Sequence, residues 1–353
     1  MTHPTDIETP AVLIDLDRVD RNIARFQEYC DRHDIAVRPH IKTHKLPRLA
    51  RQQIEAGAVG ITCQKIGEAE VMADAGIEDI FITYNIVGET KLRRLAQLAR
   101  RCRLSTVTDN AAVVAGLAGA FPHEAQPLKV LVECDTGAGR CGVQTSAEAL
   151  ALARQIHDSA GLALGGLMTY PPMTDQAPVE TWLNKARAAL LENGLPCPTV
   201  SSGGTPNMWR AHEVPSVTEH RAGTYIYNDR SLVQAGVCTA EDCALHVLAT
   251  VVSRPTPTRA IVDAGSKVLT SDLLGLQGYG MLPDFPDARL RNLSEEHGII
   301  DLSNIDWSPK IGDPLRIIPN HACVVSNMVD TVYLIRGNEV EAEQPVAARG
   351  RIT

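Results

Sequence analysis

The chain has 353 residues, of which 44% are hydrophobic, and a formal net charge of −8. This length predicts a large domain together with a smaller one, and the mild acidity, without any basic block, argues against nucleic acid as the main partner. No apolar run reaches the ~18 residues that a membrane span requires, and no signal-peptide pattern opens the sequence. The nine cysteines are scattered, as is typical of reduced thiols, so we expect a cytoplasmic protein without a membrane partner.

Short apolar segments of β-type alternate with helix-like segments through the first part of the chain. Eight of them lie at residues 35–40, 58–64, 79–85, 103–110, 129–135, 163–170, 199–204 and 221–227. Their near-continuous apolar character indicates a parallel sheet that is buried on both faces. Eight such units in roughly 230 residues predict a (β/α)₈ barrel. A doubly wound open sheet is the alternative, because periodicity does not separate the two folds.

The pattern changes near Ala240, where β-type runs follow one another with little helix between them. These runs lie at residues 245–254, 259–265, 314–322 and 331–341. They predict a smaller all-β domain. We therefore expect a barrel over residues 1–238, whose first residues could join the β domain, and a β domain over residues 239–353.

Polar residues gather where the proposed barrel strands end, and the active site of such a barrel lies at that face. Among them are Lys42 and two glycine turns, "GGT" at 203–205 and "GTY" at 223–225. Adjacent glycines allow backbone N–H groups to approach an anion closely, so the two turns could form one phosphate cup. A lysine across the barrel mouth from a phosphate cup is what a pyridoxal phosphate site requires. Each feature alone would be a plain turn or a surface lysine.

The C-terminal domain contains the stretch "PNHACVVSN" with His321 and Cys323. If this stretch is a strand, the two side chains project from the same face and can bind one ion together. Imidazole and thiolate are ligands that zinc prefers. Two ligands are nevertheless fewer than the four of a structural zinc site.

Seven stretches together resemble one enzyme family in order along the chain. They are "RPHIKTHK", "GAVGITCQKIGEAEVMADAGIEDIFITYN", "DTGAGRCGV", "SSGGTP", "RAGTYIYND", "VDAGSKVLTSD" and "IPNHACVVSN". The family is that of the metal-dependent D-serine dehydratases and D-threonine aldolases, fold-type III pyridoxal phosphate enzymes that share their barrel with alanine racemase. The resemblance implies a barrel of alanine racemase type with a C-terminal all-β domain.

The resemblance also implies roles for individual residues. Lys42 would form the Schiff base with pyridoxal phosphate and move the Cα proton of the substrate, with His40 assisting. Strand alternation would place His40, Lys42 and His44 on one face, and we expect the cationic neighbours Arg38 and His40 to favour the neutral amine that proton transfer requires. His321 and Cys323 would hold the metal. The residues implied to contact the cofactor are Gln64, Arg140, Tyr170, Gly204, Thr205, Arg221, Gly223, Thr224 and Tyr225.

The identity of the second metal ligand favours one reaction within the family. Its aldolases typically carry aspartate at this position and its D-serine dehydratases carry cysteine, so Cys323 favours dehydration and zinc over manganese or magnesium. The implied reaction is β-elimination of D-serine or 3-hydroxy-D-aspartate to a 2-oxo acid and ammonia. The alternatives are retro-aldol cleavage to glycine and an aldehyde, racemisation without metal, and a non-catalytic cofactor-binding protein. Analogy with such barrels also implies a homodimer.

Overall fold

The computed structural model describes residues 3–122 and 127–353. The chain divides into two compact units, each assembled from separate stretches of sequence. The barrel unit consists of Phe26–Lys42, Leu46–Gly223 and Arg351–Thr353. The sheet unit consists of Met1–Arg25, Thr43–Lys45 and Thr224–Gly350. Helix α1 (Leu16–Arg32) begins in the sheet unit and ends in the barrel unit.

Eight parallel strands form the barrel unit, as the sequence predicts, in the order β2-β9-β8-β7-β6-β5-β4-β3. A parallel bridge between His40, just beyond β2, and Thr62 of β3 joins the two ends of this order. The strands are β2 (Ala36–Val37), β3 (Ile61–Cys63), β4 (Asp79–Ile82), β5 (Arg103–Thr108), β6 (Leu128–Cys134), β7 (Leu162–Thr169), β8 (Thr199–Gly203) and β9 (Glu219–Arg221).

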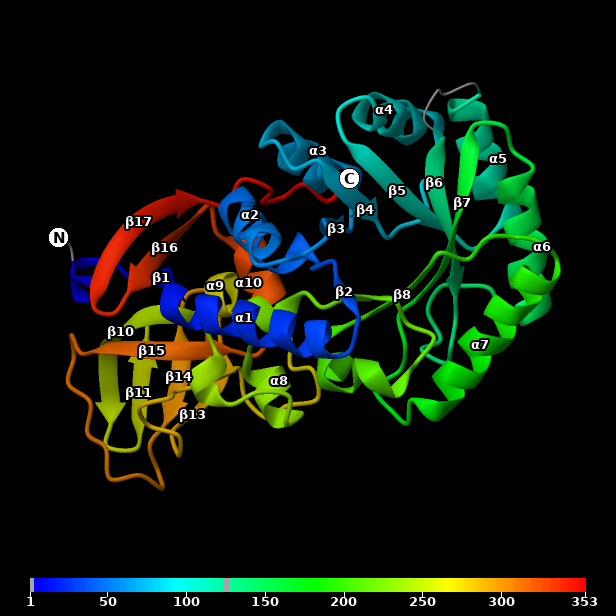
Figure 1. Cartoon of the computed structure of the whole chain (residues 1–353). Coiled ribbons are helices and arrows are strands. Elements are labelled where there is room, and N and C mark those ends of the chain that lie inside the picture. The colour runs from blue at the N-terminus through cyan, green and yellow to red at the C-terminus, as the bar shows by residue number, and fades with distance from the viewer. Residues whose placement is uncertain (1–2, 123–126) are drawn as a thin grey trace. The chain divides into compact units, whose positions relative to one another are not determined.

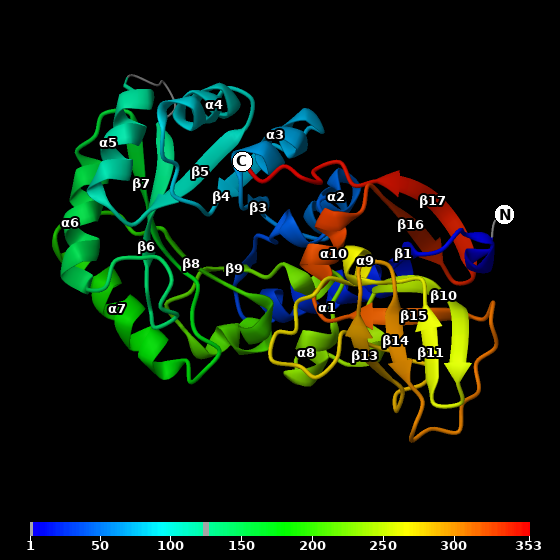
Figure 2. The same cartoon turned by 180° about the vertical axis from the view of Figure 1, so that it is seen from behind.

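Helices follow the strands and cover the outside of the barrel, as Figures 1 and 2 show for α4 to α7. The helices of this unit are α2 (Pro47–Glu55), α3 (Ile66–Asp74), α4 (Glu89–Ala99), α5 (Ala111–Ala120), α6 (Ser146–His157), α7 (Ala177–Glu192) and the 3₁₀ helix η3 (Thr205–Glu213). Local sequence fixes several of their starts. Thr145 and Glu148 form a capping box at α6, and the Asn110 side chain accepts the N–H of Val113 at α5.

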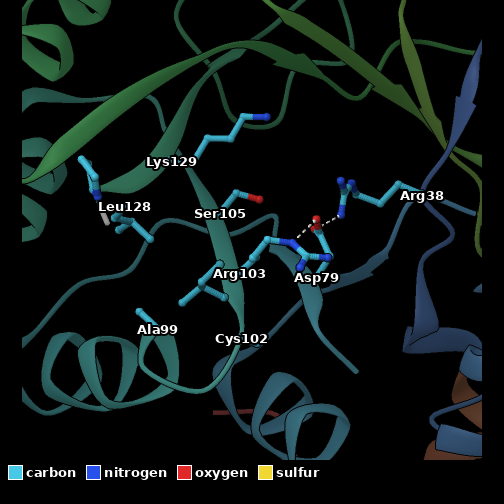
Figure 3. A pocket seen from close by; sticks show the side chains of 10 residues that line it. Arg38, Asp79, Ala99, Cys102, Arg103, Ser105, Leu128 and Lys129 are labelled. Atoms are coloured by element: carbon cyan, nitrogen blue, oxygen red, sulfur yellow. Dashed lines mark hydrogen bonds and ion pairs between the residues drawn. The ribbon is translucent and has the colours of Figure 1, made fainter. Parts of the chain in front are cut away.

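The inside of the barrel is apolar at mid-height and charged at the amino-terminal ends of the strands. Phe81, Val107, Leu131 and Met168, one from each of four neighbouring strands, form a buried cluster. Below it, a cavity of about 320 Å³ is lined by Arg38, Asp79, Ala99, Cys102, Arg103, Leu104, Ser105, Pro127, Leu128 and Lys129. Figure 3 shows the Asp79 carboxylate between the guanidinium groups of Arg38 and Arg103. This cavity lies at the opposite end of the strands from the predicted active site.

The sheet unit is built on nine strands in the order β11-β14-β13-β12-β15-β10-β1-β16-β17, several of which lie side by side in Figure 2. They are β1 (Ala11–Asp15), β10 (Leu245–Thr256), β11 (Arg259–Val262), β12 (Gly280–Met281), β13 (Arg289–Leu293), β14 (Gly298–Asp301), β15 (Pro314–Pro319), β16 (Thr331–Arg336) and β17 (Glu339–Pro345). Its short helices are η1 (Pro4–Asp6), η4 (Thr224–Ile226), α8 (Arg230–Gln234), η5 (Ala240–Asp242), α9 (Ser266–Leu269) and α10 (Ala322–Met328).

The structure changes two details of the predicted organisation. The eighth barrel strand was predicted at residues 221–227, whereas β9 ends at Arg221 and residues 224–226 form η4. The sheet unit resumes at Thr224, ahead of the predicted division at 238. It also takes in β1, a possibility that the prediction left open, and β1 pairs antiparallel with β10 and parallel with β16. Among the described helices, none is long and apolar enough to cross a membrane.

Candidate active site

Lys42 lies in a tight turn directly after the first barrel strand. Strand β2 ends at Val37, and Pro39 cannot donate to a sheet ladder. The backbone then pairs once more, at His40, and turns into the 3₁₀ helix η2 (Ile41–Thr43) with Lys42 half-buried at its centre. The prediction that His40, Lys42 and His44 share a strand face is therefore wrong.

His40 holds the Lys42 turn through its ring. The backbone N–H of Lys42 donates to His40 Nδ1 at 3.3 Å, and His40 Nε2 lies 3.1 Å from Gln64 Oε1. The amide of Gln64 is itself oriented, because its Nε2 donates to the carbonyl of Thr83 at 2.9 Å. These contacts require a proton on His40 Nε2 and a lone pair on Nδ1. His40 thus contacts the backbone of Lys42, as a positioning residue does.

The two other cations of the motif have structural partners. Lys45 is buried with a φ of 57°, and its Nζ donates to the carbonyl of Ala348 at 3.4 Å. Arg38 pairs with the carboxylates of Glu219 and Asp79. Burial alone would lower the pKa of Arg38, but these two carboxylates raise it above its ordinary value. The expectation that Arg38 tunes Lys42 is wrong, because its charge is already compensated at the amino-terminal end of the barrel.

The glycine turns after β8 and β9 are bonded to each other. The N–H of Gly223 donates to Oγ1 of the buried Thr205 at 3.2 Å. Gly204 has a φ of 106°, and a Cβ there would come within 3.0 Å of the Tyr170 ring. Only glycine meets both conditions. The predicted phosphate-binding residues of these two turns therefore meet at the carboxyl-terminal ends of neighbouring strands.

Arg221 is buried beneath these turns as a charged donor. Its Nε donates to Ser201 Oγ at 2.8 Å, and its Nη2 donates to the carbonyl of Thr169 at 2.6 Å. Burial lowers the pKa of Arg221 to about 10, so it stays cationic at neutral pH. The guanidinium of Arg140 lies 4.6 Å from the centroid of the Tyr170 ring, which is the geometry of a cation–π contact.

These residues fit a pyridine cofactor with a phosphate tail. The barrel unit offers a half-buried lysine, two linked glycine turns where a phosphate can approach the backbone, and a buried arginine. A Cβ at Gly203 would lie 3.1 Å from the Arg221 guanidinium carbon, so backbone and cation pack closely there. Pyridoxal phosphate requires these features together.

His321 and Cys323 lie at the start of a helix and not on a strand. Strand β15 ends at Pro319, His321 is the N-cap residue of α10, and the N–H of Ala322 donates to the buried Asp229 at 3.0 Å. The predicted strand placement is therefore wrong, but the two side chains still meet. A hydrogen bond with Cys323 is the main cause that raises the pKa of His321 to about 9, and a further one with Asp272 adds to it.

Three polar contacts surround the two predicted metal ligands within the sheet unit. Nδ1 of His321 lies 2.8 Å from Oδ2 of Asp272. The Cys323 sulfur lies 3.1 Å from the hydroxyl of Thr43 and 3.5 Å from that of Thr224. The sequence reasoning missed Asp272 and Thr43, although both lie in stretches that carry the family resemblance, "VDAGSKVLTSD" and "RPHIKTHK".

Thr224 was predicted to contact the cofactor phosphate, with Tyr225 close by. Both belong to the sheet unit, where the Thr224 hydroxyl faces the Cys323 sulfur and the Tyr225 side chain is buried. The Thr224 hydroxyl therefore lies at the predicted metal ligand Cys323.

The donor set of His321 and Cys323 fits a transition-metal ion that keeps positions open for water or substrate. Among residues 3–122 and 127–353, no group of three or more His, Cys, Asp or Glu side chains is arranged to hold a metal. An imidazole and a thiol within hydrogen-bonding reach of each other are suitable ligands for zinc. A closed structural zinc site needs four protein ligands, and His321 and Cys323 provide two.

Comparison with known proteins shows which family the chain resembles. The family described as alanine racemase, N-terminal domain, matches residues 14–231, and the one described as "Putative serine dehydratase domain" matches residues 244–335. A D-threonine aldolase from Arthrobacter sp. is 35% identical over 98% of this chain and 93% of its own length. A D-threo-3-hydroxyaspartate dehydratase from Delftia sp. (strain HT23) is 36% identical over 98% of this chain and 96% of its own length.

The chain belongs to the D-serine dehydratase and D-threonine aldolase family. The structure of D-threonine aldolase from Filomicrobium marinum superposes with a TM-score of 0.92 at 33% identity, covering 99% of this chain and 97% of that one. The family membership makes the chain a fold-type III pyridoxal phosphate enzyme of the lyase class. The coverage extends over both units, so the family assignment is not confined to the barrel.

Proposed function

We propose that this enzyme removes water from a β-hydroxy D-amino acid, D-serine or 3-hydroxy-D-aspartate, and releases a 2-oxo acid and ammonia. The observation that carries the proposal is Cys323 beside His321, with the hydroxyl groups of Thr43 and Thr224 at its sulfur. A histidine and cysteine pair favours zinc among the available divalent ions. A related D-threo-3-hydroxyaspartate dehydratase variant, whose structure has been solved in a metal-free form, is in keeping with a metal in this enzyme.

Each chemical role falls to a residue already described. When bound, pyridoxal phosphate withdraws electrons from the substrate Cα, and zinc acts as a Lewis acid towards the β-hydroxyl. The neutral amine of Lys42 takes the Cα proton, and His40 orients the Lys42 turn. Thr205, Gly204 and Gly223 would hold the phosphate. Loss of the Cα proton and of the hydroxide from Cβ amounts to one water, and hydrolysis of the resulting enamine gives the 2-oxo acid and ammonia.

Arg221 and Arg140 complete the proposed cofactor pocket, with Tyr170 and Gln64. Arg221 stays cationic and would face the pyridine nitrogen, leaving that nitrogen unprotonated and the electron sink moderate. More of the activation would then come from the metal on His321 and Cys323. Arg140, held over Tyr170, would reach the phenolic oxygen of the cofactor.

Retro-aldol cleavage is the second candidate, because an aldolase and a dehydratase match this chain at 35% and 36% identity. The two reactions make different demands on the substrate hydroxyl. Cleavage of the Cα–Cβ bond needs the hydroxyl deprotonated, whereas elimination needs it to leave. A thiolate ligand donates more charge to the ion than a carboxylate does, so the ion deprotonates a bound hydroxyl less readily. This effect disfavours cleavage of the Cα–Cβ bond and favours elimination.

Product analysis decides between the two reactions. The holoenzyme is incubated with D-serine, D-threonine and 3-hydroxy-D-aspartate, and ammonia, 2-oxo acids, glycine and aldehydes are measured. We expect ammonia and a 2-oxo acid in equal amounts. Glycine as the main product from any of these substrates would show that the enzyme is an aldolase.

The cofactor lysine is tested by the visible absorbance of the purified holoenzyme. Lys42→Ala should abolish the cofactor band, because Lys42 is the proposed point of attachment. Lys45→Met is the matched control, since Lys45 is buried and donates to a backbone carbonyl. Loss of the band in the Lys45 variant alone, in a folded protein, would transfer the role to Lys45.

Metal removal separates the two cofactors. Chelation should leave the visible band unchanged and abolish turnover, and zinc should restore the activity. Full activity in metal-free enzyme would count against a catalytic metal on His321 and Cys323.

For the assembly, we propose a homodimer in the cytoplasm, by analogy with other fold-type III barrels. Light scattering of the purified enzyme tests the number of subunits.

A further inference from the structure

We infer that Asp272 is a positioning residue for His321: it holds the imidazole so that Nε2 faces the metal. This inference rests on the proposed function, because it takes His321 as a metal ligand. Asp272 has no assigned role in the family motifs described above. It lies in the segment between α9 and β12, so the inference gives this segment a role in positioning His321.

The first observation is the contact between the two side chains. Nδ1 of His321 and Oδ2 of Asp272 are 2.8 Å apart, and both side chains are only partly exposed, at 30% and 40%. A carboxylate can only accept, so the proton of a neutral His321 lies on Nδ1. The lone pair is then on Nε2, which is the atom left to bind an ion. Metal-binding histidines are commonly oriented by a carboxylate on the other ring nitrogen.

The second observation is that the neighbour of His321 holds the backbone of Asp272. The side chain of Asn320 is fully buried, and its Nδ2 donates to the carbonyls of Asp272 at 3.0 Å and Gly278 at 2.9 Å. Its Oδ1 accepts from Arg230 at 3.0 Å. Asn320 therefore fixes the loop that carries Asp272, and Asp272 in turn fixes the residue after Asn320. The ring and its acceptor cannot move independently.

The third observation is the unusual backbone at the start of this loop. Thr270 has a φ of 65° and a ψ of 157°, a region that is occupied almost only by glycine. Its hydroxyl accepts the N–H of Asp272 at 3.2 Å. A β-branched residue in this conformation is strained. Such strain persists where surrounding contacts determine the backbone, and here those contacts direct Asp272 at His321.

Asp272 acts as an orienting group in this arrangement rather than as a third ligand. Its Oδ2 is occupied by the imidazole, and no cluster of three metal-binding side chains occurs in the described part of the chain. The carboxylate raises the basicity of the ring and restricts its rotation. Both effects strengthen the bond from Nε2 to the ion.

Zinc affinity of the cofactor-loaded, chelator-treated enzyme tests the inference by calorimetric titration. Asp272→Ala should weaken zinc binding about 100-fold and Asp272→Asn about 10-fold, within the range known for such orienting groups. Asn keeps an acceptor of the same shape but lacks the charge, so it separates orientation from basicity. The exposed Asp284, in the same unit, provides the matched control as Asp284→Asn, with no change expected.

The outcomes distinguish this inference from the proposed function. His321→Ala should abolish zinc binding, and unchanged affinity in that variant would show that the metal site itself is wrong. If His321→Ala loses zinc while both Asp272 variants bind as wild type does, only the role of Asp272 is overturned. The visible cofactor band and the thermal midpoint of each variant report folding. If Asp272→Ala fails to fold, the isosteric Asp272→Asn decides the question.

Discussion

At the scale of single residues, Lys42 is positioned by a run of hydrogen bonds that begins on a neighbouring strand. The Thr83 carbonyl orients the Gln64 amide, this amide orients the His40 ring, and the ring accepts the N–H of Lys42. Each hydrogen bond determines whether the next group acts as a donor or as an acceptor. The lysine turn is thereby tied to the ends of β3 and β4.

Substitution of His40 should reduce turnover without removing the cofactor. His40→Ala removes the acceptor for the Lys42 N–H, and one such hydrogen bond is worth about 1 kcal/mol, so we expect a fall of roughly 5- to 10-fold in kcat. His40→Asn offers an oxygen near the position of Nδ1 and should recover part of the loss. Steady-state kinetics with the visible band as a reference measure this. Equal losses in both variants would contradict a role through Nδ1.

Thr43 follows Lys42 in the sequence, and its hydroxyl lies 3.1 Å from the sulfur of Cys323, the proposed metal ligand. A hydroxyl that donates to a thiolate withdraws charge from the sulfur. In cobalt-substituted enzyme, Thr43→Val should therefore shift the sulfur-to-metal charge-transfer band to longer wavelength. Thr43→Ser keeps the hydroxyl and is the matched control. An unchanged band in Thr43→Val would mean that the hydroxyl does not donate to the bound thiolate.

Residues that stand in a recognisable motif can be proposed from the sequence, whereas a contact that depends on the shape of a loop cannot. Lys42, His321 and Cys323 stand in short recognisable stretches. Asp272 reaches His321 only because Asn320 and Thr270 shape the intervening loop. Nothing in local composition encodes such a contact, since it joins residues that are 49 positions apart.

At the scale of elements, the buried barrel strands could be predicted because they are apolar on both faces. The segments that follow β2 and β15 could not be predicted in this way. After β2 the backbone pairs once more at His40 and then turns into η2 in place of a longer strand. The β-branched run after His321 indicates a strand, but Asp229 accepts the N–H of Ala322 and the segment begins α10. At α10 a tertiary contact overrides propensity.

The charged end of the barrel offers a stability test at this scale. Arg38 joins the first residues of β4 and β9 through Asp79 and Glu219, with its Nε 2.7 Å from Glu219 Oε2. Arg38→Met removes the buried cation from both carboxylates and leaves Asp79 with only the exposed Arg103, so we expect the free energy of unfolding to fall by about 3 kcal/mol. Urea unfolding of the cofactor-free protein measures this change.

Arg103→Met is the matched control for Arg38→Met, because Arg103 contacts the same Asp79 from an exposed position at 3.5 Å. An exposed pair contributes about 0–1 kcal/mol, so this variant should be close to wild type. Equal losses for the two variants would show that burial of Arg38 does not determine the effect.

At the scale of the whole molecule, neither unit is a continuous stretch of chain. Strand β1 comes from the N-terminus and pairs with β10 and β16, which lie more than two hundred residues later. The sequence pattern predicts that such strands exist but not their partners, because pairing between distant strands is set by tertiary packing. The two classes of domain could thus be predicted, and their interleaved composition could not.

Each unit also contains a buried histidine whose pKa is lowered by burial, and these two rings predict how the molecule responds to acid. Burial lowers the pKa of His220, in β9, to about 4 and that of His246, in β10, to about 3. In the unfolded chain both rings titrate near pH 6.5, so below that pH only the unfolded state gains the two protons. Stability is therefore complete above about pH 7 and is lost as the pH falls towards the folded pKa values.

When the pH falls from 7.5 to 5.5, each of these two histidines should lower the free energy of unfolding by about 1.4 kcal/mol. The loss arises mainly over the one pH unit that lies below the pKa of 6.5 in the unfolded chain. His246→Asn removes one titrating ring, so its loss over this range should be smaller than that of wild type by about that amount. Urea unfolding of the cofactor-free protein, followed by circular dichroism at both pH values, measures the difference. Carboxylates contribute equally to both proteins and cancel in the comparison.

His157→Asn is the control, because it replaces an exposed ring in α6, and it should keep the wild-type pH dependence. If His246→Asn loses as much stability as wild type, His246 is not held neutral in the folded sheet.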